Sequence, residues 1–530
     1  MELKAGGKSP FLLRDVLLEE AAGSEREDPE LLDASRGAAN WQQPLVLAAW
    51  HALGLYSAQA ASRRSHDPHV ALSLAPGESH LSAFDEFASR CEGAPGGLAE
   101  GCRFLQRGWD LLARTVLRGW SREEIAFRFA EAAAGRAYPE PPTLDFVQPI
   151  MARYLAPLLF GGDADLAAQF EVIACEGATT GIAQVATTLA RNGLISPGDR
   201  VAMWWPTYEP LRDLVECQLG CEVVPIHRDP EAGWAAEAED LERLIDPGVR
   251  MAVTVSPGNP VPVTTDPGSL DALQRAAEAH PDLLTLADYV YMQFLDSPVE
   301  TEIARLPRNT IGVYSVSKDF GLAGMRLGVV LMHAESVAQA ALWRLEGEER
   351  AAADGWYCRR AMEPAQMGLT ERIIADSRGV SFTHMSGLST PLQALICLCA
   401  LYDLMEPDSH RYFQWVRGEL AERIEALYRG LGIETPRWTQ GPSSRYSTII
   451  DLTDVARARG GMELAEALRS HAPWDFMTHL AREWQVILTP GESFGAGEWT
   501  VRACFPSVDA AQARELGQRV ARAVQQFAGS

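Results

Sequence analysis

The chain has 530 residues, of which 47% are hydrophobic and 22% are charged, a composition typical of a soluble globular protein with a large core. Its 47 Lys and Arg residues against 71 Asp and Glu residues give a net charge of −24, which argues against nucleic-acid binding, because phosphate backbones attract clustered cations. No apolar run reaches the roughly 18 residues of a membrane span. The cysteines show neither disulfide nor metal-ligand spacing, so we expect a cytoplasmic protein without a metal site or a membrane partner.

Residues 1–150 are expected to form an N-terminal helical extension. Apolar residues recur there at intervals of three and four, as in Phe104, Leu105, Trp109 and Leu112, which is the spacing of a helix with one buried face. The proline-rich stretch AYPEPPT then interrupts the pattern.

Residues 151–385 are expected to form a large α/β domain. Short apolar runs such as FEVIAC, DRVAMWW, RMAVTVS and TIGVYSVS alternate with helical stretches. This alternation indicates a mostly parallel sheet that is buried on both faces. Residues 386–530 contain long helices followed by the strand-like runs SSRYSTIIDLT and EWTVRACFP, which predict a small C-terminal α+β domain.

The loops that follow the strands of such a sheet are where ligands bind. The first of them, EGATTG, opens a helix with Gly177, Ala178 and Thr179. Free N–H groups and a hydroxyl at a helix start suit a phosphate group, although an ordinary helix cap has the same composition. The next, MWWPTYEP, carries Tyr208, whose ring would either stack on a flat ligand or fill the core.

Two further loops carry polar residues directly after apolar runs. Asn259 lies in SPGNPV, where a simple turn is the alternative explanation. Asp288 ends the run LLTLAD, and Tyr291 follows three residues later. A buried carboxylate is costly unless it meets a cation or a donor, so we interpret Asp288 as a functional or paired residue.

The stretch VYSVSKDFGLAGMRLG surrounds Lys318 with small residues, among them Ser315 and Ser317. An amine held among small residues at a strand end is desolvated, which lowers its pKa and suits Schiff-base formation. Arg326 follows and offers a rigid fork for a phosphate group. Together, the five loops match the needs of pyridoxal 5′-phosphate (PLP): an amine for the aldehyde, a carboxylate for the pyridine nitrogen, an aromatic for the ring face and a phosphate cradle.

These motifs resemble those of the fold-type I, class I/II aminotransferase family, and SVSKDFGLAGMRLG and ADYVY carry the likeness. The resemblance implies an aspartate aminotransferase-like fold, a homodimer or larger assembly, and catalytic roles for Lys318, Asp288 and Tyr208. It further implies that Arg502 grips the α-carboxylate of an amino-acid substrate.

A narrower resemblance links KSPFLLRDVLLEEA, LLDASRGAANW, AYPEPP and FGAGEWTVR to the aspartate 4-decarboxylase group. Those enzymes have a similar N-terminal extension and convert aspartate to alanine, with transamination as a side activity. By this resemblance Arg14, Arg36 and Tyr138 lie on the substrate side. The chain departs from the group in SRGAANW, where the group has Gly-Arg-Gly-Asn-Pro-Asn-Trp, and in ACFP after Arg502.

Three functions therefore stay open. The first is decarboxylation and transamination of aspartate through external aldimine, quinonoid and ketimine. The second is γ-elimination, for example on S-adenosylmethionine, to a β,γ-unsaturated intermediate used for carbon–carbon bond formation in specialised metabolism. The third is a non-catalytic ligand sensor on the same fold.

Overall fold

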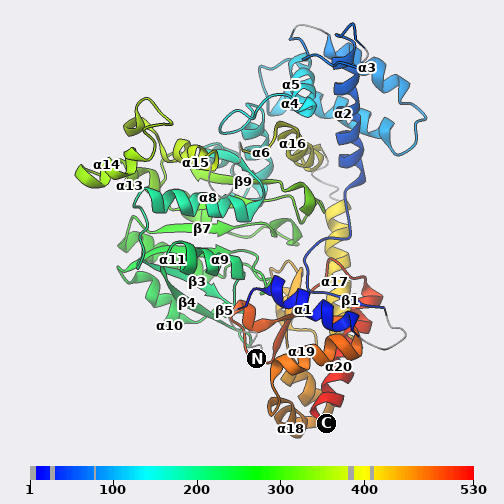
Figure 1. Cartoon of the computed structure of the whole chain (residues 1–530), viewed down its shortest axis with the longest axis vertical. Helices are drawn as coiled ribbons and strands as arrows, with labels where there is room; N and C mark the ends of the chain where they lie inside the picture. The colour runs from blue at the N-terminus through cyan, green and yellow to red at the C-terminus, as the bar shows by residue number, and fades with distance from the viewer. Residues whose placement is uncertain are drawn as a thin grey trace. The chain divides into compact units, whose positions relative to one another are not determined.

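The computed structural model describes residues 8–23, 30–67, 69–76, 79–379, 387–405 and 411–529. The chain divides into two compact units (Figure 1). Unit 1 comprises Met1–Trp41, Ile195–Asn309 and Tyr412–Ser530, and unit 2 comprises Gln42–Leu194 and Thr310–Arg411. The domain boundaries expected from the sequence (1–150, 151–385 and 386–530) remain a proposal. His384 lies outside the described residues.

One part of unit 2 is a group of helices. They are α2 (Pro44–Ser62), α3 (His80–Arg90), α4 (Leu98–Thr115), α5 (Arg122–Ala134) and α16 (Thr390–Met405). Helix α4 packs closely because it has glycines where two neighbouring helices approach. A Cβ on Gly101 would lie 2.5 Å from Ala48 of α2, and one on Gly108 would lie 2.3 Å from Leu401 of α16. The predicted buried face of α4 is confirmed by Trp109 and Leu112, which are 0% exposed.

The strands of unit 2 carry the loops around Gly177 and Lys318. They are β2 (Phe170–Cys175), β8 (Thr310–Tyr314) and β9 (Gly328–His333), in the order β2-β9-β8 with antiparallel pairing. Helix α6 (Val147–Leu159) contacts β2, and α8 (Ala178–Arg191) contacts all three strands. All five residues of β8 and all six of β9 are buried, as expected for strands covered on both faces.

The large sheet portion of unit 1 has the order β7-β6-β3-β4-β5. Its strands are β3 (Arg200–Trp205), β4 (Glu222–Asp229), β5 (Ala235–Ala236), β6 (Val249–Val255) and β7 (Leu284–Asp288). The pairs β3–β4, β3–β6 and β6–β7 are parallel, and β4–β5 is antiparallel. Because β3, β6 and β7 run in the same direction, their carboxyl ends lie at one edge, where Tyr208, Asn259 and Asp288 follow or end them.

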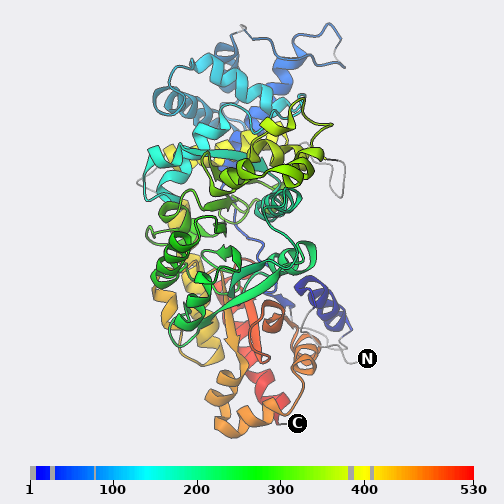
Figure 2. The ribbon, with the colours of Figure 1, turned by 90° about the vertical axis from the view of Figure 1, so that its left-hand side faces the viewer.

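A smaller antiparallel sheet lies in the C-terminal part of unit 1, in the order β10-β13-β12. Its strands are β10 (Ser447–Asp451), β12 (Thr489–Pro490) and β13 (Thr500–Cys504), and its helices include α17 (Arg411–Leu431), α18 (Leu452–Arg469), α19 (Pro473–Trp484) and α20 (Ala510–Ala528). The N-terminal segment joins this part: β1 (Leu32–Asp33) pairs in parallel with β11 (Val486–Ile487), and α1 (Pro10–Ala22) packs against α19 (Figures 1 and 2).

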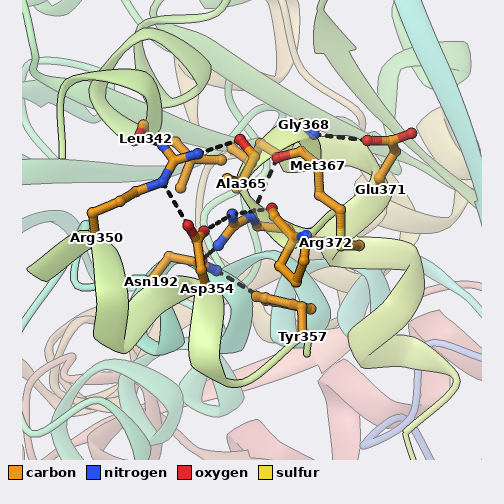
Figure 3. Close-up of polar contacts among 12 residues, drawn as sticks. Asn192, Leu342, Arg350, Asp354, Tyr357, Ala365, Met367, Gly368, Glu371 and Arg372 are labelled. Atoms are coloured by element: carbon orange, nitrogen blue, oxygen red, sulfur yellow. Dashed lines mark hydrogen bonds and ion pairs between the residues drawn. The ribbon is translucent and has the colours of Figure 1, made fainter. Parts of the chain in front are cut away.

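A buried network of hydrogen bonds and ion pairs connects a helical insertion of unit 2 to the end of α8. The insertion consists of α13 (Val337–Arg344), α14 (Gly347–Gly355) and α15 (Leu369–Ser377). Arg372 is 0% exposed and lies over the Tyr357 ring, 4.7 Å from its centroid. Its guanidinium donates to Asn192, 2.6 Å away, and to Asp354 (Figure 3). Asn192 is the C-cap of α8, so the network holds that helix at the end opposite Gly177.

Candidate functional site

Asp288 is fixed by the backbone around it. It is the last residue of β7 and is 5% exposed. Its carbonyl oxygen accepts a hydrogen bond from the Ser256 N–H at 2.9 Å, and its carboxylate accepts one from the Val290 N–H at 3.1 Å. The carboxylate therefore has a set position at the edge where ligands of this sheet would bind.

Tyr291 links Asp288 to the other predicted residues of unit 1. Burial raises its pKa well above the usual value, and the negative charge of Asp288 and the nearby Tyr208 raise it further, whereas Arg502 lowers it. The phenol of Tyr291 thus stays protonated and can donate a hydrogen bond. These interactions bring Asp288 and Tyr291, which share a loop, together with Tyr208 and Arg502 from two other parts of the chain.

Arg502 on β13 has only neutral partners among the residues that the structure describes. It is 7% exposed. It donates from Nη1 to Asn259 Oδ1 at 3.2 Å and from Nη2 to Thr489 Oγ1 at 3.3 Å and to the Ser35 carbonyl oxygen. Its guanidinium carbon lies 4.5 Å from the centroid of the Phe494 ring. The Nε–H is buried and has no acceptor among the described residues.

The N-terminal segment reaches Arg502 through Ser35, and Arg14 holds that segment in place. Arg14 donates to Asp33 at 2.6 Å and to Ser35 Oγ at 3.0 Å, and Ser35 Oγ donates to Asp33 at 2.5 Å. Arg36 is exposed and makes no hydrogen bond or ion pair with a described residue. Arg14 therefore acts here as a positioning residue, and its direct contact with substrate stays a prediction.

Lys318 follows β8 and is half-buried. The hydroxyls beside it are almost fully buried: Ser315 donates to the Leu327 carbonyl at 2.5 Å and lies 2.8 Å from the Ser317 hydroxyl. The chain has lysine only at positions 4, 8 and 318. Lys318 is therefore the single lysine beyond the first eight residues, which the local motif alone did not reveal.

The residues predicted to hold a phosphate group include Gly177 and Arg326, which adjoin within unit 2. Gly177 is the N-cap of α8 and has φ +93°, a region that favours glycine. Arg326, with φ +54°, donates to the Ala323 carbonyl at 2.9 Å and to the Glu176 carbonyl at 3.4 Å. A Cβ on Gly177 would lie 2.6 Å from Arg326 Nη2. The helix start with its N–H groups and the guanidinium thus share a space that a larger residue would fill, which fits a phosphate group.

One buried and one half-buried acid near these loops were missed by the sequence analysis. Asp319 is 0% exposed and accepts hydrogen bonds from Tyr314 at 2.5 Å and from the Phe320 N–H at 3.0 Å. Burial, with a smaller contribution from the charge of Asp403, raises its pKa to about 7. Burial also raises the pKa of Glu176. Neither residue had a sequence signal, because the groups that bury Asp319 come from distant helices.

The remaining candidates differ in setting. Trp204 is 2% exposed and donates to Ser269 at 2.9 Å, so it belongs to the core. Trp205 packs so tightly that a Cβ on Gly495 would lie 1.9 Å from its indole nitrogen. Tyr138 is 87% exposed in unit 2. In the described part of the chain no cluster of His, Cys, Asp or Glu is suited to a metal ion, and no helix is long and apolar enough to cross a bilayer.

The structure places the predicted site residues in two sets. Unit 1 holds Arg14, Arg36, Tyr208, Asn259, Asp288, Tyr291 and Arg502, and unit 2 holds Tyr138, Gly177, Ala178, Thr179, Ser315, Ser317, Lys318 and Arg326. Within unit 1, Arg502 contacts Asn259 and Ser35, and Tyr291 lies near Asp288 and Tyr208. Within unit 2, Arg326 lies against Gly177, and Ser315 bonds to Ser317. That the two sets form a single site stays a prediction.

The family model described as aminotransferase class I and II matches residues 126–520. The chain belongs to this family. A bifunctional aspartate aminotransferase and L-aspartate beta-decarboxylase from Pseudomonas sp is 32% identical over 520 residues, which cover 97% of this chain and 95% of the relative. A valine–pyruvate aminotransferase from Mycobacterium tuberculosis is 35% identical over 146 residues, 27% of this chain and 37% of the relative.

The fold is that of the aspartate aminotransferases. The structure of the Thermus thermophilus aspartate aminotransferase with maleate superposes with a TM-score of 0.58 at 17% identity and covers 99% of this chain and 97% of that chain. The predictions of the family, the α/β fold class and a PLP-dependent enzyme are confirmed. The cradle between Gly177 and Arg326 fits the phosphate of that cofactor.

Proposed function

We propose that this enzyme converts L-aspartate to L-alanine and carbon dioxide, with transamination as a side reaction. The buried guanidinium of Arg502 carries the proposal. A buried cation is unfavourable unless an anion or several acceptors surround it. Arg502 has neutral acceptors, an unpaired Nε–H and no carboxylate partner among the described residues. The α-carboxylate of an amino acid supplies the missing charge and the missing acceptor.

A dicarboxylic amino acid needs a second cation, and Arg36 is placed to supply it. Arg36 is exposed, has no partner among the described residues and follows Ser35, whose carbonyl oxygen accepts from Arg502. Arg14 fixes this segment through Asp33. We therefore assign Arg36 to the side-chain carboxylate of the substrate and Arg14 to the positioning of Arg36.

Bound PLP supplies an electron sink for the substrate. Lys318 holds the cofactor, and its amine then takes the proton from the substrate Cα. Asp288 keeps the pyridine nitrogen protonated, Tyr208 covers the ring face, and Asn259 and Tyr291 bind the phenolic oxygen. The phosphate is held by Gly177, Ala178, Thr179, Ser315, Ser317 and Arg326.

The decarboxylation balances without a further reactant. The bond between Cβ and Cγ breaks, carbon dioxide leaves, and the electron pair that remains on Cβ takes up a proton. No oxidant or reductant is needed. The specific demand on the protein is a pocket that admits a carboxylate on Cβ, which is the role assigned to Arg36.

We further propose that the enzyme is a cytoplasmic homodimer or larger assembly. Tyr138 supports this proposal, because its ring is 87% exposed in unit 2 and the family resemblance assigns it to the substrate side. An exposed aromatic residue of this kind is suited to complete the pocket of a second subunit.

The function is tested by mixing the cofactor-loaded enzyme separately with L-aspartate and with S-adenosylmethionine, followed by mass analysis of the products. Formation of alanine from aspartate supports the proposal. Release of methylthioadenosine from S-adenosylmethionine, with no reaction of aspartate, would assign the enzyme to γ-elimination in specialised metabolism. Turnover of neither compound, nor of any other amino acid, would favour a non-catalytic ligand sensor.

A further inference from the structure

Unit 1 contains a groove of about 840 Å³ that none of the predicted site residues lines. It lies between α17 and the loop that ends at Arg445, with Asp296 at its border. Gly418 on α17 faces open space, because a Cβ built there would meet no atom within 4 Å. A volume of several hundred Å³ is that of a small-molecule site.

The groove concentrates positive charge on a strongly acidic protein. Its lining includes Arg417, Arg429 and Arg445 but only two acids, Asp296 and Glu425, whereas the chain as a whole carries a net charge of −24. Guanidinium groups that converge on a concave surface attract anions from solution. The three arginines and two acids leave the groove with a net charge of +1.

The acid at the border is already engaged by two of the arginines. Arg445 Nη2 lies 2.7 Å from Asp296, and Arg417 Nε lies 3.9 Å from it. Arg429 is exposed and has no hydrogen bond or ion pair with a described residue. Arg429 is therefore the cation that remains for a ligand.

Arg445 is held in an unfavourable backbone conformation. Its φ is +50°, which costs free energy for any residue other than glycine. Its side chain is 12% exposed and its Nε donates to the Thr439 carbonyl at 2.8 Å. Such strained residues concentrate at binding sites, and here the strain keeps a guanidinium at the groove.

We propose that this groove binds a small organic anion, with its phosphate or carboxylate group at Arg429 and an apolar body against Ala421 and Ile433. Both residues line the groove and are partly exposed, so they supply an apolar wall. Phosphate and carboxylate share the chemistry that an arginine fork recognises, so the test uses one probe of each kind. The site is independent of the proposed aspartate reaction.

The test is calorimetric titration of the cofactor-loaded enzyme with phenyl phosphate and with phenylacetate at constant ionic strength. At least one probe is expected to bind saturably, one per chain. Arg429→Gln is expected to weaken it about tenfold, the effect of losing one charge-assisted hydrogen bond. Arg153→Gln removes an exposed helical arginine elsewhere and is expected to change nothing.

A second pair of variants separates binding from folding. Gly418→Phe places a ring in the groove, at a position where the Cβ meets no atom within 4 Å, and is expected to abolish binding, whereas Gly418→Ala is expected to retain it. Both replace a helical glycine, so neither should lower the melting temperature. Absence of saturable binding by both probes would overturn the proposal. Binding that persists in Gly418→Phe would overturn it as well, whether or not it changes the cofactor absorbance.

Discussion

The protonation of Asp319, the residue next to Lys318, is coupled to the stability of the folded protein. Burial raises its pKa to about 7 in the folded protein, from the 3.8 of an ordinary aspartate. The polar groups that face it are the hydroxyl of Tyr314, the carboxyl of Asp403 and the thiol of Cys399. Between these two pKa values the unfolded chain has lost the proton that the folded chain keeps, so stability falls as pH rises.

We therefore predict that Asp319→Asn removes this loss of stability with rising pH. The variant should gain stability relative to the parent enzyme as pH rises from 4 to 8, by up to about 4 kcal/mol. Chemical unfolding at several pH values measures the difference. The exposed Asp165→Asn serves as the control and should show no such trend. A constant difference between Asp319→Asn and the parent across this range would show that Asp319 does not titrate as described.

Arg36 is predicted to select a substrate with two carboxylates. Arg36→Gln should raise KM for L-aspartate about tenfold or more, because it removes a charge-assisted contact to the side-chain carboxylate. Steady-state kinetics measure the change, and Arg153→Gln is the matched control. If Arg36→Gln leaves KM unchanged, the second carboxylate is bound by another residue.

Sequence analysis identified the residues whose signal is local. Lys318, Asp288 and Asn259 each lie at the end of an apolar run or shortly after it, so the strand and the polar residue beyond it could be recognised together. Asp319 and Arg14 could not be interpreted in that way. Asp319 accepts from Tyr314 on β8, which also bonds to Tyr154 on α6, and Asp403 comes from α16. Arg14 meets Asp33 only because β1 and α1 pack on the C-terminal part of unit 1.

At the scale of elements, the insertion that carries Arg372 stabilises the C-terminal end of α8. Thr188 donates to Asp376 at 2.8 Å, and Arg191 pairs with the same carboxylate at 2.9 Å. Asn192 accepts from Arg372 at 2.6 Å. These three contacts connect α15 to the last turn and a half of the helix whose other end is the predicted phosphate site; Figure 3 shows the contact between Asn192 and Arg372.

Arg372→Met is predicted to destabilise unit 2 by about 3–5 kcal/mol, because Asp354 and Asn192 would lose a buried cationic partner. Denaturant unfolding measures this loss. Arg359→Met, at an exposed arginine of the same insertion, should stay within about 0.5 kcal/mol of the parent. Equal effects of the two substitutions would mean that the buried network contributes nothing specific.

The longer elements were predictable and the shortest were not. The run FEVIAC became β2 and TIGVY became β8, because a short and mostly apolar run indicates a buried strand. Strand β1 has two residues and depends on pairing with β11, more than 450 positions along the chain. A contact of that range leaves no periodic pattern in the sequence.

For the whole molecule, we predict a homodimer or a larger assembly. Sedimentation equilibrium should give a mass of at least twice the 57.9 kDa of the chain. Tyr138→Ala should then lower kcat/KM for aspartate at unchanged mass, since its exposed ring would complete the pocket of the neighbouring subunit. A monomer with full activity would contradict the assembly and the role of Tyr138.

The measurement that tests the central claim most directly is reduction of the loaded enzyme with borohydride, followed by digestion and mass mapping. With lysine only at positions 4, 8 and 318, the assignment is unambiguous. The account predicts a phosphopyridoxyl group on the peptide that contains Lys318, and its loss in Lys318→Ala but not in Lys8→Ala. A label on Lys4 or Lys8, or an unmodified Lys318 in active enzyme, would contradict it.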